Sequence, residues 1–214
     1  MTKNEKRALA SAVYDRLEKL YPAAECALEY GGDPWRLLVM ARLSAQCTDA
    51  RVNIVSRELF SRFPTVEAMA DADVHEIEEL VKPCGLYRMK AANIKDASKM
   101  LITDFGGRVP DTMEELLRLD GVGRKIANLI LGDVYAKPAV VCDTHCIRIC
   151  GRLGLYPEKL KDPAKVEMIL RDLIDISRGS DFCHRIVLFG REICSARAPK
   201  CSECPLNDIC RGRK

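Results

Sequence analysis

The sequence lacks the features that mark a membrane-bound or secreted protein. Its 214 residues contain no uninterrupted apolar run that approaches the ~20 residues needed to span a bilayer. The first seven residues are polar and have no apolar core of a secretory signal peptide. Internal repeats and linkers rich in Gly, Pro or Ser are also missing, so composition alone marks no domain boundary. We therefore expect a cytoplasmic protein with one large domain or two small ones.

Strand-like alternation of apolar and polar residues is almost absent as well. The only β-like run, Ala139–Val141, is too short to carry a sheet. Apolar residues instead recur at helical spacing, as Leu9, Val13 and Leu17 do near the N-terminus. Helix start signals support this pattern, among them the N-cap and first-turn proline Asp33-Pro34. The sequence predicts an all-α fold.

The sequence has little excess of one charge sign. It contains 34 Lys and Arg residues and 31 Asp and Glu residues, so its net charge is only +3. A surface for nucleic acid must therefore be local. The segment Leu119–Lys125 is such a candidate, since Gly121 and Gly123 flank Val122 between two helical patterns and allow a tight turn. The free N–H groups and the positive dipole end of the second helix meet at this turn, which predicts a phosphate-binding site.

Lys125 lies in the first turn of that second helix, beside Arg124. The helix dipole and the neighbouring guanidinium both disfavour an ammonium there. A neutral amine is what a lysine nucleophile requires, so Lys125 is a candidate nucleophile. Spacing alone favours a plainer interpretation, a phosphate contact or a solvated surface charge, since lysines are common at helix starts.

Four of the eleven cysteines stand close together near the C-terminus, separated by six, two and five residues: Cys194, Cys201, Cys204 and Cys210. In a chain without a secretory signal, they indicate metal ligation in a reducing compartment. Four thiolates suit both a zinc ion and an iron–sulfur cluster, and the spacing alone leaves the two nearly balanced.

The segment from Cys142 to Cys150 carries two further features. Asp143 precedes an apolar-periodic helix and is interpreted as its N-cap, a contact that typically contributes ~1 kcal/mol. Cys142, Cys146 and Cys150 are four residues apart and share one face of that helix, which invites a second metal site. Cysteine also packs as a small apolar side chain when it is buried, and we favour this interpretation.

Two motifs together resemble a known family. Asp120–Lys125 followed by Val141–His145 is similar to the helix-hairpin-helix DNA glycosylases, in particular to the endonuclease III family. The resemblance also takes in Leu43–Gln46, Gly85–Tyr87 and the last four cysteines, so it covers nearly the whole chain. It implies a two-domain helix-hairpin-helix DNA glycosylase fold, with a six-helix domain over 27–137 and an iron–sulfur cluster domain over 1–26 and 138–214. Duplex DNA would bind in the cleft between them.

The resemblance implies a bifunctional base-excision repair enzyme that removes oxidised pyrimidines, such as thymine glycol, and then cleaves the strand at the abasic site. After the damaged nucleotide rotates out of the duplex, Lys125 attacks the sugar C1′ and expels the base. The Schiff base that results permits β-elimination, which cuts the strand on the 3′ side. Asp143 faces the lysine, stabilises developing positive charge and helps to move a proton.

The resemblance also implies which residues bind DNA. Gln46 fills the hole left by the rotated nucleotide, and Leu86 is the apolar wedge beside it. Without the resemblance, these two are a surface amide and a loop anchor, and Arg148 is equally well a solvated charge. The full set of expected DNA-binding residues is Gln46, Leu86, Gly121, Val122, Gly123, Arg124, His145 and Arg148.

In this family the four terminal cysteines hold a [4Fe–4S] cluster, which pins the loop Ser195–Lys200 and turns Arg197 and Lys200 towards a DNA phosphate. Main-chain carbonyls of Leu119 and Val122 would hold a monovalent cation when DNA is bound. We expect a monomer whose partner is double-stranded DNA with an oxidised pyrimidine or an abasic site, and no membrane partner.

The same residues allow a comparison between the bifunctional glycosylase and two alternative functions. A monofunctional adenine or mismatch glycosylase of the same superfamily would lack Lys125, and the adenine enzyme would carry a glutamate where Ala41 stands. A non-catalytic helix-hairpin-helix DNA-binding protein needs neither Lys125 nor Asp143. The presence of both residues favours the bifunctional enzyme.

Overall fold

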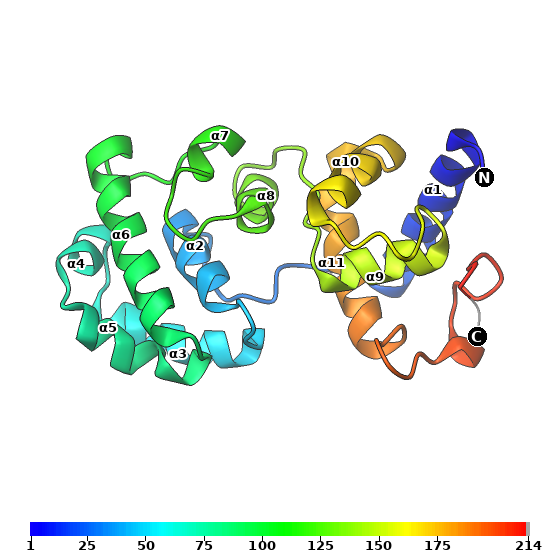
Figure 1. Ribbon diagram of the computed structural model, residues 1–214. Coiled ribbons are helices and arrows are strands. Elements are labelled where there is room, and N and C mark those ends of the chain that lie inside the picture. The colour runs from blue at the N-terminus through cyan, green and yellow to red at the C-terminus, as the bar shows by residue number, and fades with distance from the viewer. Residues whose placement is uncertain (213–214) are drawn as a thin grey trace. The chain divides into compact units, whose positions relative to one another are not determined.

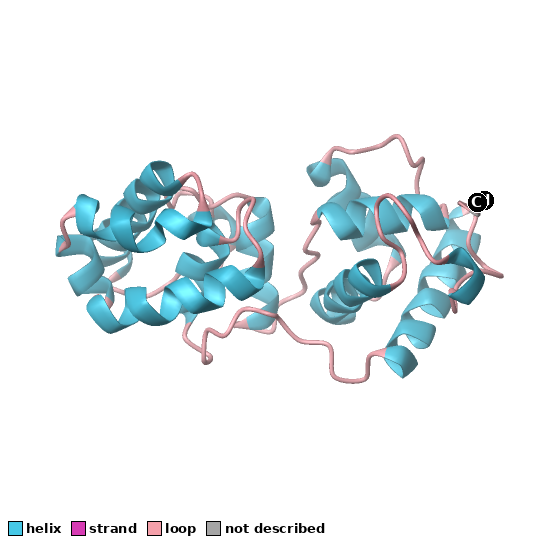
Figure 2. Cartoon of the chain, turned by 90° about the horizontal axis from the view of Figure 1, so that it is seen from below, coloured by secondary structure: helices cyan, strands magenta, loops and turns pink. Residues whose placement is uncertain are grey.

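The computed structural model describes residues 1–212, and these residues form helices joined by loops (Figures 1 and 2). No strand occurs in the described range, which confirms the predicted all-α fold. None of the described helices combines the length and the apolar character that a membrane span requires. The α-helices are α1 (Lys3–Leu20), α2 (Pro34–Leu43), α3 (Asp49–Arg62), α4 (Val66–Asp71), α5 (Val74–Val81), α6 (Tyr87–Phe105), α7 (Met113–Leu116), α8 (Arg124–Asp133), α9 (Thr144–Leu153), α10 (Pro163–Leu173) and α11 (Gly179–Glu192). Three 3₁₀ turns accompany them, η1 (Lys82–Cys84), η2 (Ile176–Arg178) and η3 (Cys201–Glu203).

Helix starts lie where the capping signals predict them. The Asp33 carboxylate accepts hydrogen bonds from the N–H groups of Trp35 and Arg36, and Pro34 opens α2. Asp162 caps α10 in the same way, with Pro163 in its first turn. A carboxylate at these positions satisfies N–H groups that the helix itself leaves unpaired.

The chain divides into two compact units. One is continuous, Cys26–Tyr135, and its longest helix, α6, packs against α4, α5, η1 and α2, while α8 packs against α2. The other unit is built from both ends of the chain, Met1–Glu25 and Ala136–Lys214, and α11 packs there against α9 and α1. Each unit has its own buried apolar side chains, such as Leu37 and Leu59 in the first and Phe182 and Phe189 in the second.

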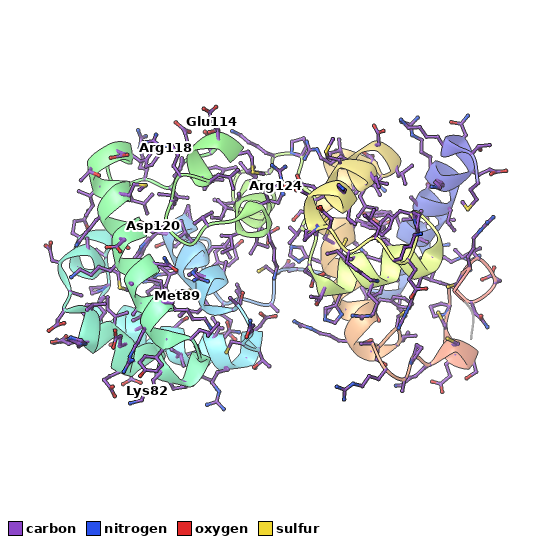
Figure 3. The ribbon with its side chains drawn as sticks, viewed as in Figure 1. Lys82, Met89, Glu114, Arg118, Asp120 and Arg124 are labelled. Atoms are coloured by element: carbon purple, nitrogen blue, oxygen red, sulfur yellow. The ribbon has the colours of Figure 1, made fainter. Side chains whose placement is uncertain are left out.

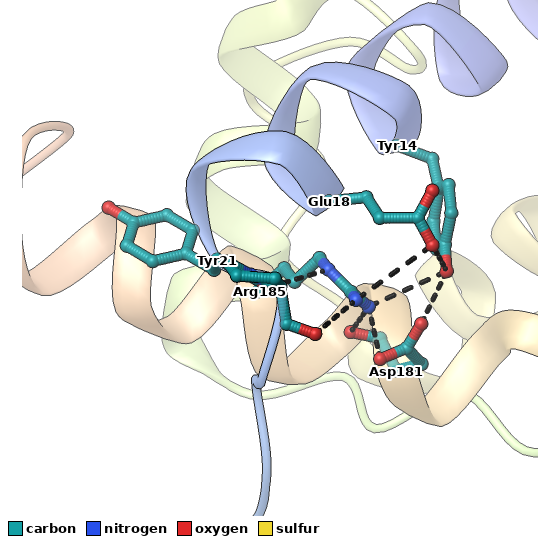
Figure 4. A network of polar contacts seen from close by, with 6 residues as sticks. Tyr14, Glu18, Tyr21, Asp181 and Arg185 are labelled. Atoms are coloured by element: carbon teal, nitrogen blue, oxygen red, sulfur yellow. Dashed lines mark hydrogen bonds and ion pairs between the residues drawn. The ribbon is translucent and has the colours of Figure 1, made fainter.

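A partly buried polar network joins α1 to α11 in the discontinuous unit (Figure 4). The Arg185 side chain is only 5% exposed and forms ion pairs with Asp181 and Glu18. Its guanidinium also donates to the main-chain oxygens of Tyr21, at 3.1 Å, and Pro22, at 3.4 Å. The Tyr14 hydroxyl donates to Asp181, and burial together with this carboxylate raises the pKa of Tyr14. The network fixes the N-terminal helix to the C-terminal third of the chain.

Candidate active site

The hairpin, defined here as the turn Leu119–Gly123 between α7 and α8, has the geometry that an anion site requires. Gly121 has φ +73°, in the region that favours glycine, and the N–H of Val122 donates to the Leu119 carbonyl at 3.1 Å. Gly123 is the N-cap of α8 and supplies no side-chain cap. The Val122 side chain is buried while both glycines are exposed, so the first N–H groups of α8 are not covered by a hairpin side chain. The predicted tight turn is confirmed. Figure 3 shows Asp120 in this turn and Arg124 where α8 begins.

An arginine–asparagine pair packs against Gly121 of the hairpin, and no motif in the sequence indicates it. Arg42 of α2 donates from Nε and Nη2 to the Asn93 Oδ1 of α6, at 3.1 and 2.6 Å. A Cβ placed on Gly121 would lie 2.5 Å from the Arg42 Nε and 2.9 Å from the Asn93 Cβ. Glycine is required at this position both for its φ angle and for the space that the pair leaves.

Replacing Gly121 by alanine is therefore expected to destabilise the fold by at least about 2 kcal/mol, since it adds a strained φ and a steric clash. Gly123→Ala is the matched control. Its φ is −102°, and a Cβ there meets no atom within 4 Å. It should cost less than about 1 kcal/mol but place a methyl group before the N–H groups of α8 and weaken DNA binding. Thermal unfolding and a DNA-binding titration check both variants, and equal destabilisation would contradict this account.

Lys125 lies in the first turn of α8, and its side chain is exposed. Within the part of the chain that the structure describes, no hydrogen bond or ion pair holds its ammonium group. This exposure fits a solvated surface charge as well as a nucleophile that is open to a substrate. Lys125 is presented to solvent at the end of the helix where N–H groups gather.

Gln46 and Leu86 share an unusual backbone conformation. Gln46, between α2 and α3, has φ +55°, and Leu86, the residue before α6, has φ +49°. Non-glycine residues seldom adopt such angles, which cost of order 1–3 kcal/mol and persist where the surrounding structure enforces them. Both side chains point out of the fold, and Leu86 is 49% exposed. Met89, which the sequence analysis did not select, is 50% exposed one turn further along α6 (Figure 3).

Asp143 is the N-cap of α9, as predicted. Its Oδ1 accepts a hydrogen bond from the Cys146 N–H at 2.7 Å, and the side chain is half-buried. The cap uses Oδ1, and Oδ2 is therefore available to a further partner. Asp143 belongs to the discontinuous unit, whereas Lys125 belongs to the continuous one.

Arg148 is not a solvated charge. Its Nη2 donates to the Cys194 carbonyl at 2.9 Å and to the Gly190 carbonyl at 3.4 Å, and lies 3.1 Å from the His145 Nδ1. The guanidinium thus ties α9 to the end of α11 and to the first of the four terminal cysteines. His145, half-buried one turn earlier, lies beside it. Contacts of either residue with DNA stay predictions.

The four terminal cysteines surround one cavity. Its other lining residues are mainly apolar and include Ile149, Leu153, Phe189 and Leu206. The Leu206 N–H donates to the Cys204 sulfur at 3.4 Å, and the Arg152 guanidinium donates to the Cys194 sulfur at 3.4 Å. Such donors stabilise thiolates, so the site fits an iron–sulfur cluster.

Cys142, Cys146 and Cys150 pack in the core, which confirms the favoured interpretation. All three are buried, and the Cys146 thiol lies beside the thiols of Cys142, Cys150 and Cys183. These neighbouring thiols and burial raise the pKa of Cys146. Among the described residues, these cysteines do not form a group of three or more side chains that could hold a metal ion.

Arg152 is a further residue that the sequence analysis missed. Besides the Cys194 sulfur, it donates to the Ser195 carbonyl at 2.7 Å and the Ala196 carbonyl at 2.8 Å. It therefore fixes the start of the loop that carries Arg197 and Lys200. Only its distance in sequence, more than 40 residues from its partners, hid this role.

Comparisons with known proteins agree with this geometry. The model of the HhH-GPD superfamily base excision DNA repair protein matches residues 39–175, and that of the iron-sulfur binding domain of endonuclease III matches residues 194–210. Endonuclease III from Synechocystis sp. is 45% identical over 206 residues, which cover 96% of this chain and 93% of that protein. Endonuclease III from Bacillus subtilis is 41% identical over 198 residues, 92% of this chain and 89% of that protein.

Solved structures give the same picture. A non-covalent endonuclease III–DNA complex superposes with a TM-score of 0.91 at 38% identity, over 99% of this chain and 96% of that chain. A thermostable thymine-DNA glycosylase superposes with a TM-score of 0.86 at 23% identity, over 100% of this chain and 99% of that one. The second likeness is one of fold alone.

Proposed function

The chain belongs to the HhH-GPD superfamily of base excision DNA repair proteins, and from this premise we propose that it removes oxidised pyrimidines, such as thymine glycol, from duplex DNA. It is a DNA glycosylase with abasic-site lyase activity and contains an iron–sulfur cluster. The observation that carries the proposed chemistry is the placement of Lys125, exposed in the first turn of α8 beside the hairpin and with no hydrogen-bond or ion-pair partner among residues 1–212.

The proposed nucleophile is the neutral amine of Lys125. Its nitrogen bonds to the sugar C1′ as the C1′–N bond to the damaged base breaks, and the base leaves with the electron pair of that bond. Loss of the lysine proton and opening of the sugar ring yield a Schiff base. Removal of a C2′ proton then expels the 3′ phosphate, which cleaves the strand by β-elimination.

Asp143 is proposed to stabilise the positive charge that develops on the sugar during this reaction. With Oδ1 bound to the Cys146 N–H, the carboxylate is held in one orientation by the helix it caps. Its second oxygen would face the positive charge on the sugar and accept the proton released by Lys125. Charge stabilisation and proton transfer are therefore assigned to the same group.

DNA recognition is proposed to use exposed positions around the hairpin and on the neighbouring loops. The N–H groups at Gly121–Gly123 and the Arg124 side chain would bind one phosphate. Gln46 would occupy the place of the rotated nucleotide, and Leu86 would separate the adjacent base pairs. His145 and Arg148 would each contact the lesion or a DNA phosphate.

The four terminal cysteines are proposed to hold a [4Fe–4S] cluster with a structural role. When bound, it supplies a rigid anchor for the loop Ser195–Lys200, whose Arg197 and Lys200 would then contact a phosphate. We also propose a monovalent cation at the carbonyls of Leu119 and Val122 when DNA is bound. The protein is proposed to act as a cytoplasmic monomer on double-stranded DNA with an oxidised pyrimidine or an abasic site.

Borohydride trapping on a duplex with a single thymine glycol tests the proposal. A covalent protein–DNA adduct on the damaged duplex, and none on the undamaged one, is the expected result. Base release without an adduct would indicate a water nucleophile and a monofunctional glycosylase. Binding with neither outcome would indicate a non-catalytic DNA-binding protein.

A further inference from the structure

One buried lysine links the two loops that carry Gln46 and Leu86. The Lys90 Nζ donates to the Leu43 carbonyl and to the Cys84 carbonyl, each at 2.8 Å. Leu43 is the last residue of α2 and lies three residues before Gln46. Cys84 is the last residue of η1 and lies two residues before Leu86. A single ammonium group thus connects the bases of two loops that are 40 residues apart in sequence.

Lys90 is a buried charge whose compensation comes from two carbonyls at the ends of α2 and η1. The side chain is 0% exposed, and its charge has no carboxylate partner among the described residues. Burial lowers the pKa of Lys90, as expected for an ammonium removed from water. An apolar side chain of similar volume usually stabilises a core at least as well as a buried charge. A buried polar contact of this kind can instead fix one arrangement of the chain.

The two hydrogen bonds of Lys90 lie where they can hold the two strained loops in place. The residues at the tips, Gln46 and Leu86, hold positive φ angles, which the surrounding structure must enforce. Three ammonium protons in tetrahedral arrangement can bind two carbonyls that approach from different directions, which a planar or single donor cannot do as well. Lys90 lies on α6, one turn after Leu86, so this helix itself carries the link.

We propose that Lys90 is a positioning residue that fixes the spacing of the Gln46 and Leu86 tips, so that both side chains enter the duplex together as the damaged nucleotide rotates out. The inference rests on the DNA contacts proposed above for Gln46 and Leu86. Lys90 touches neither DNA nor the reacting atoms. Its effect should therefore fall on the rotation of the nucleotide and leave the bond-making steps at Lys125 unchanged.

The test compares two substrates under single-turnover conditions. One duplex carries thymine glycol opposite adenine, and the other carries it opposite a stable abasic analogue. Without an opposing base, the lesion is unpaired and its rotation costs less. For Lys90→Met, the excision rate should fall about 10- to 100-fold on the paired lesion, because a small misplacement of positioning groups has effects of this size. On the unpaired lesion, the loss should shrink to less than about threefold.

Lys95→Met is the matched control. Lys95 lies on the same helix, and its ammonium group also donates to a main-chain carbonyl, that of Ala72, away from both loops. The Lys95→Met variant should show the wild-type ratio of the two excision rates, even if the melting temperature of the variant is lower. Gln46→Ala and Leu86→Ala should reproduce the selective loss on the paired lesion.

The outcomes distinguish a failure of the role proposed for Lys90 from a failure of the proposed function. Equal losses on both substrates for Lys90→Met would overturn the proposal. So would a selective loss on the paired lesion for Lys95→Met that matches that of Lys90→Met, because Lys90 would then act only through the fold. If Lys90→Met does not fold, Lys90→Gln, which retains two N–H donors, takes its place. Failure of both to fold would also assign Lys90 to the fold alone. No excision by the wild type would instead overturn the proposed function, and unaffected Gln46 and Leu86 variants would overturn their DNA contacts.

Discussion

Replacing Lys125 by alanine is expected to abolish covalent trapping with borohydride and to slow base excision and strand cleavage by at least about 10³-fold. The reason is that the Schiff base is proposed to form on this nitrogen, and Lys125 is the one lysine of α8. DNA binding should fall much less, because the hairpin N–H groups and Arg124 remain in place. Trapping yields and single-turnover rates on a thymine glycol duplex measure the loss, and a binding titration measures the affinity.

Lys99→Ala provides the control for this result. Lys99 is an exposed lysine of the same structural unit, on α6, and its Nζ lies 4.0 Å from the Asp96 carboxylate. It should trap and cleave as the wild type does. A Lys125→Ala variant that still forms the adduct would assign the Schiff base to another amine. One that loses the adduct but still excises the base at the wild-type rate would make Lys125 a lyase residue only.

Asp143→Asn is expected to lower the excision rate by about 10²-fold or more while the protein stays folded. Asparagine caps a helix as well as aspartate does, so the hydrogen bond to the Cys146 N–H can survive and the free energy of unfolding should change by less than about 0.5 kcal/mol. What the variant removes is the negative charge and the ability to accept a proton. Excision kinetics and thermal unfolding, measured on the same preparation, separate the two effects.

Asp162→Asn is a close control, since Asp162 is also an N-cap aspartate of the discontinuous unit and is exposed. It should have wild-type activity. Asp143→Ala, in contrast, should lose both activity and about 1 kcal/mol of stability, because the cap is lost as well. An Asp143→Asn variant that excises the base at the wild-type rate would limit Asp143 to capping α9.

The parts of the site that depend on local sequence could be predicted from it. Gly121 and Gly123 predict the turn, and Asp143 predicts the cap of α9, because both effects arise within a few residues. The cysteine spacing predicts a ligand set but leaves its occupant open. The family match over residues 194–210 resolves that choice in favour of an iron–sulfur cluster.

The parts that depend on long-range contacts could not be predicted. Nothing in the neighbourhood of Gln46 or Leu86 requires a positive φ, and glycine would be the usual residue there. The nearest long-range contact to both loops is that of Lys90, which donates to the carbonyls of Leu43 and Cys84, 47 and 6 residues away in sequence. Likewise, Arg152 shows no motif, because its partners Ser195 and Ala196 are 43 and 44 residues away.

The network of Tyr14, Asp181 and Arg185 has a consequence for the order in which the nascent chain acquires its structure. The Tyr14 hydroxyl and the Asp181 carboxylate are separated by 167 residues. On the ribosome, all of Cys26–Tyr135 is therefore made before the native partner of the first helix exists. The helix that emerges first is among the last to be buried, and its apolar face, with Val13 and Leu17, must remain soluble until translation is nearly finished.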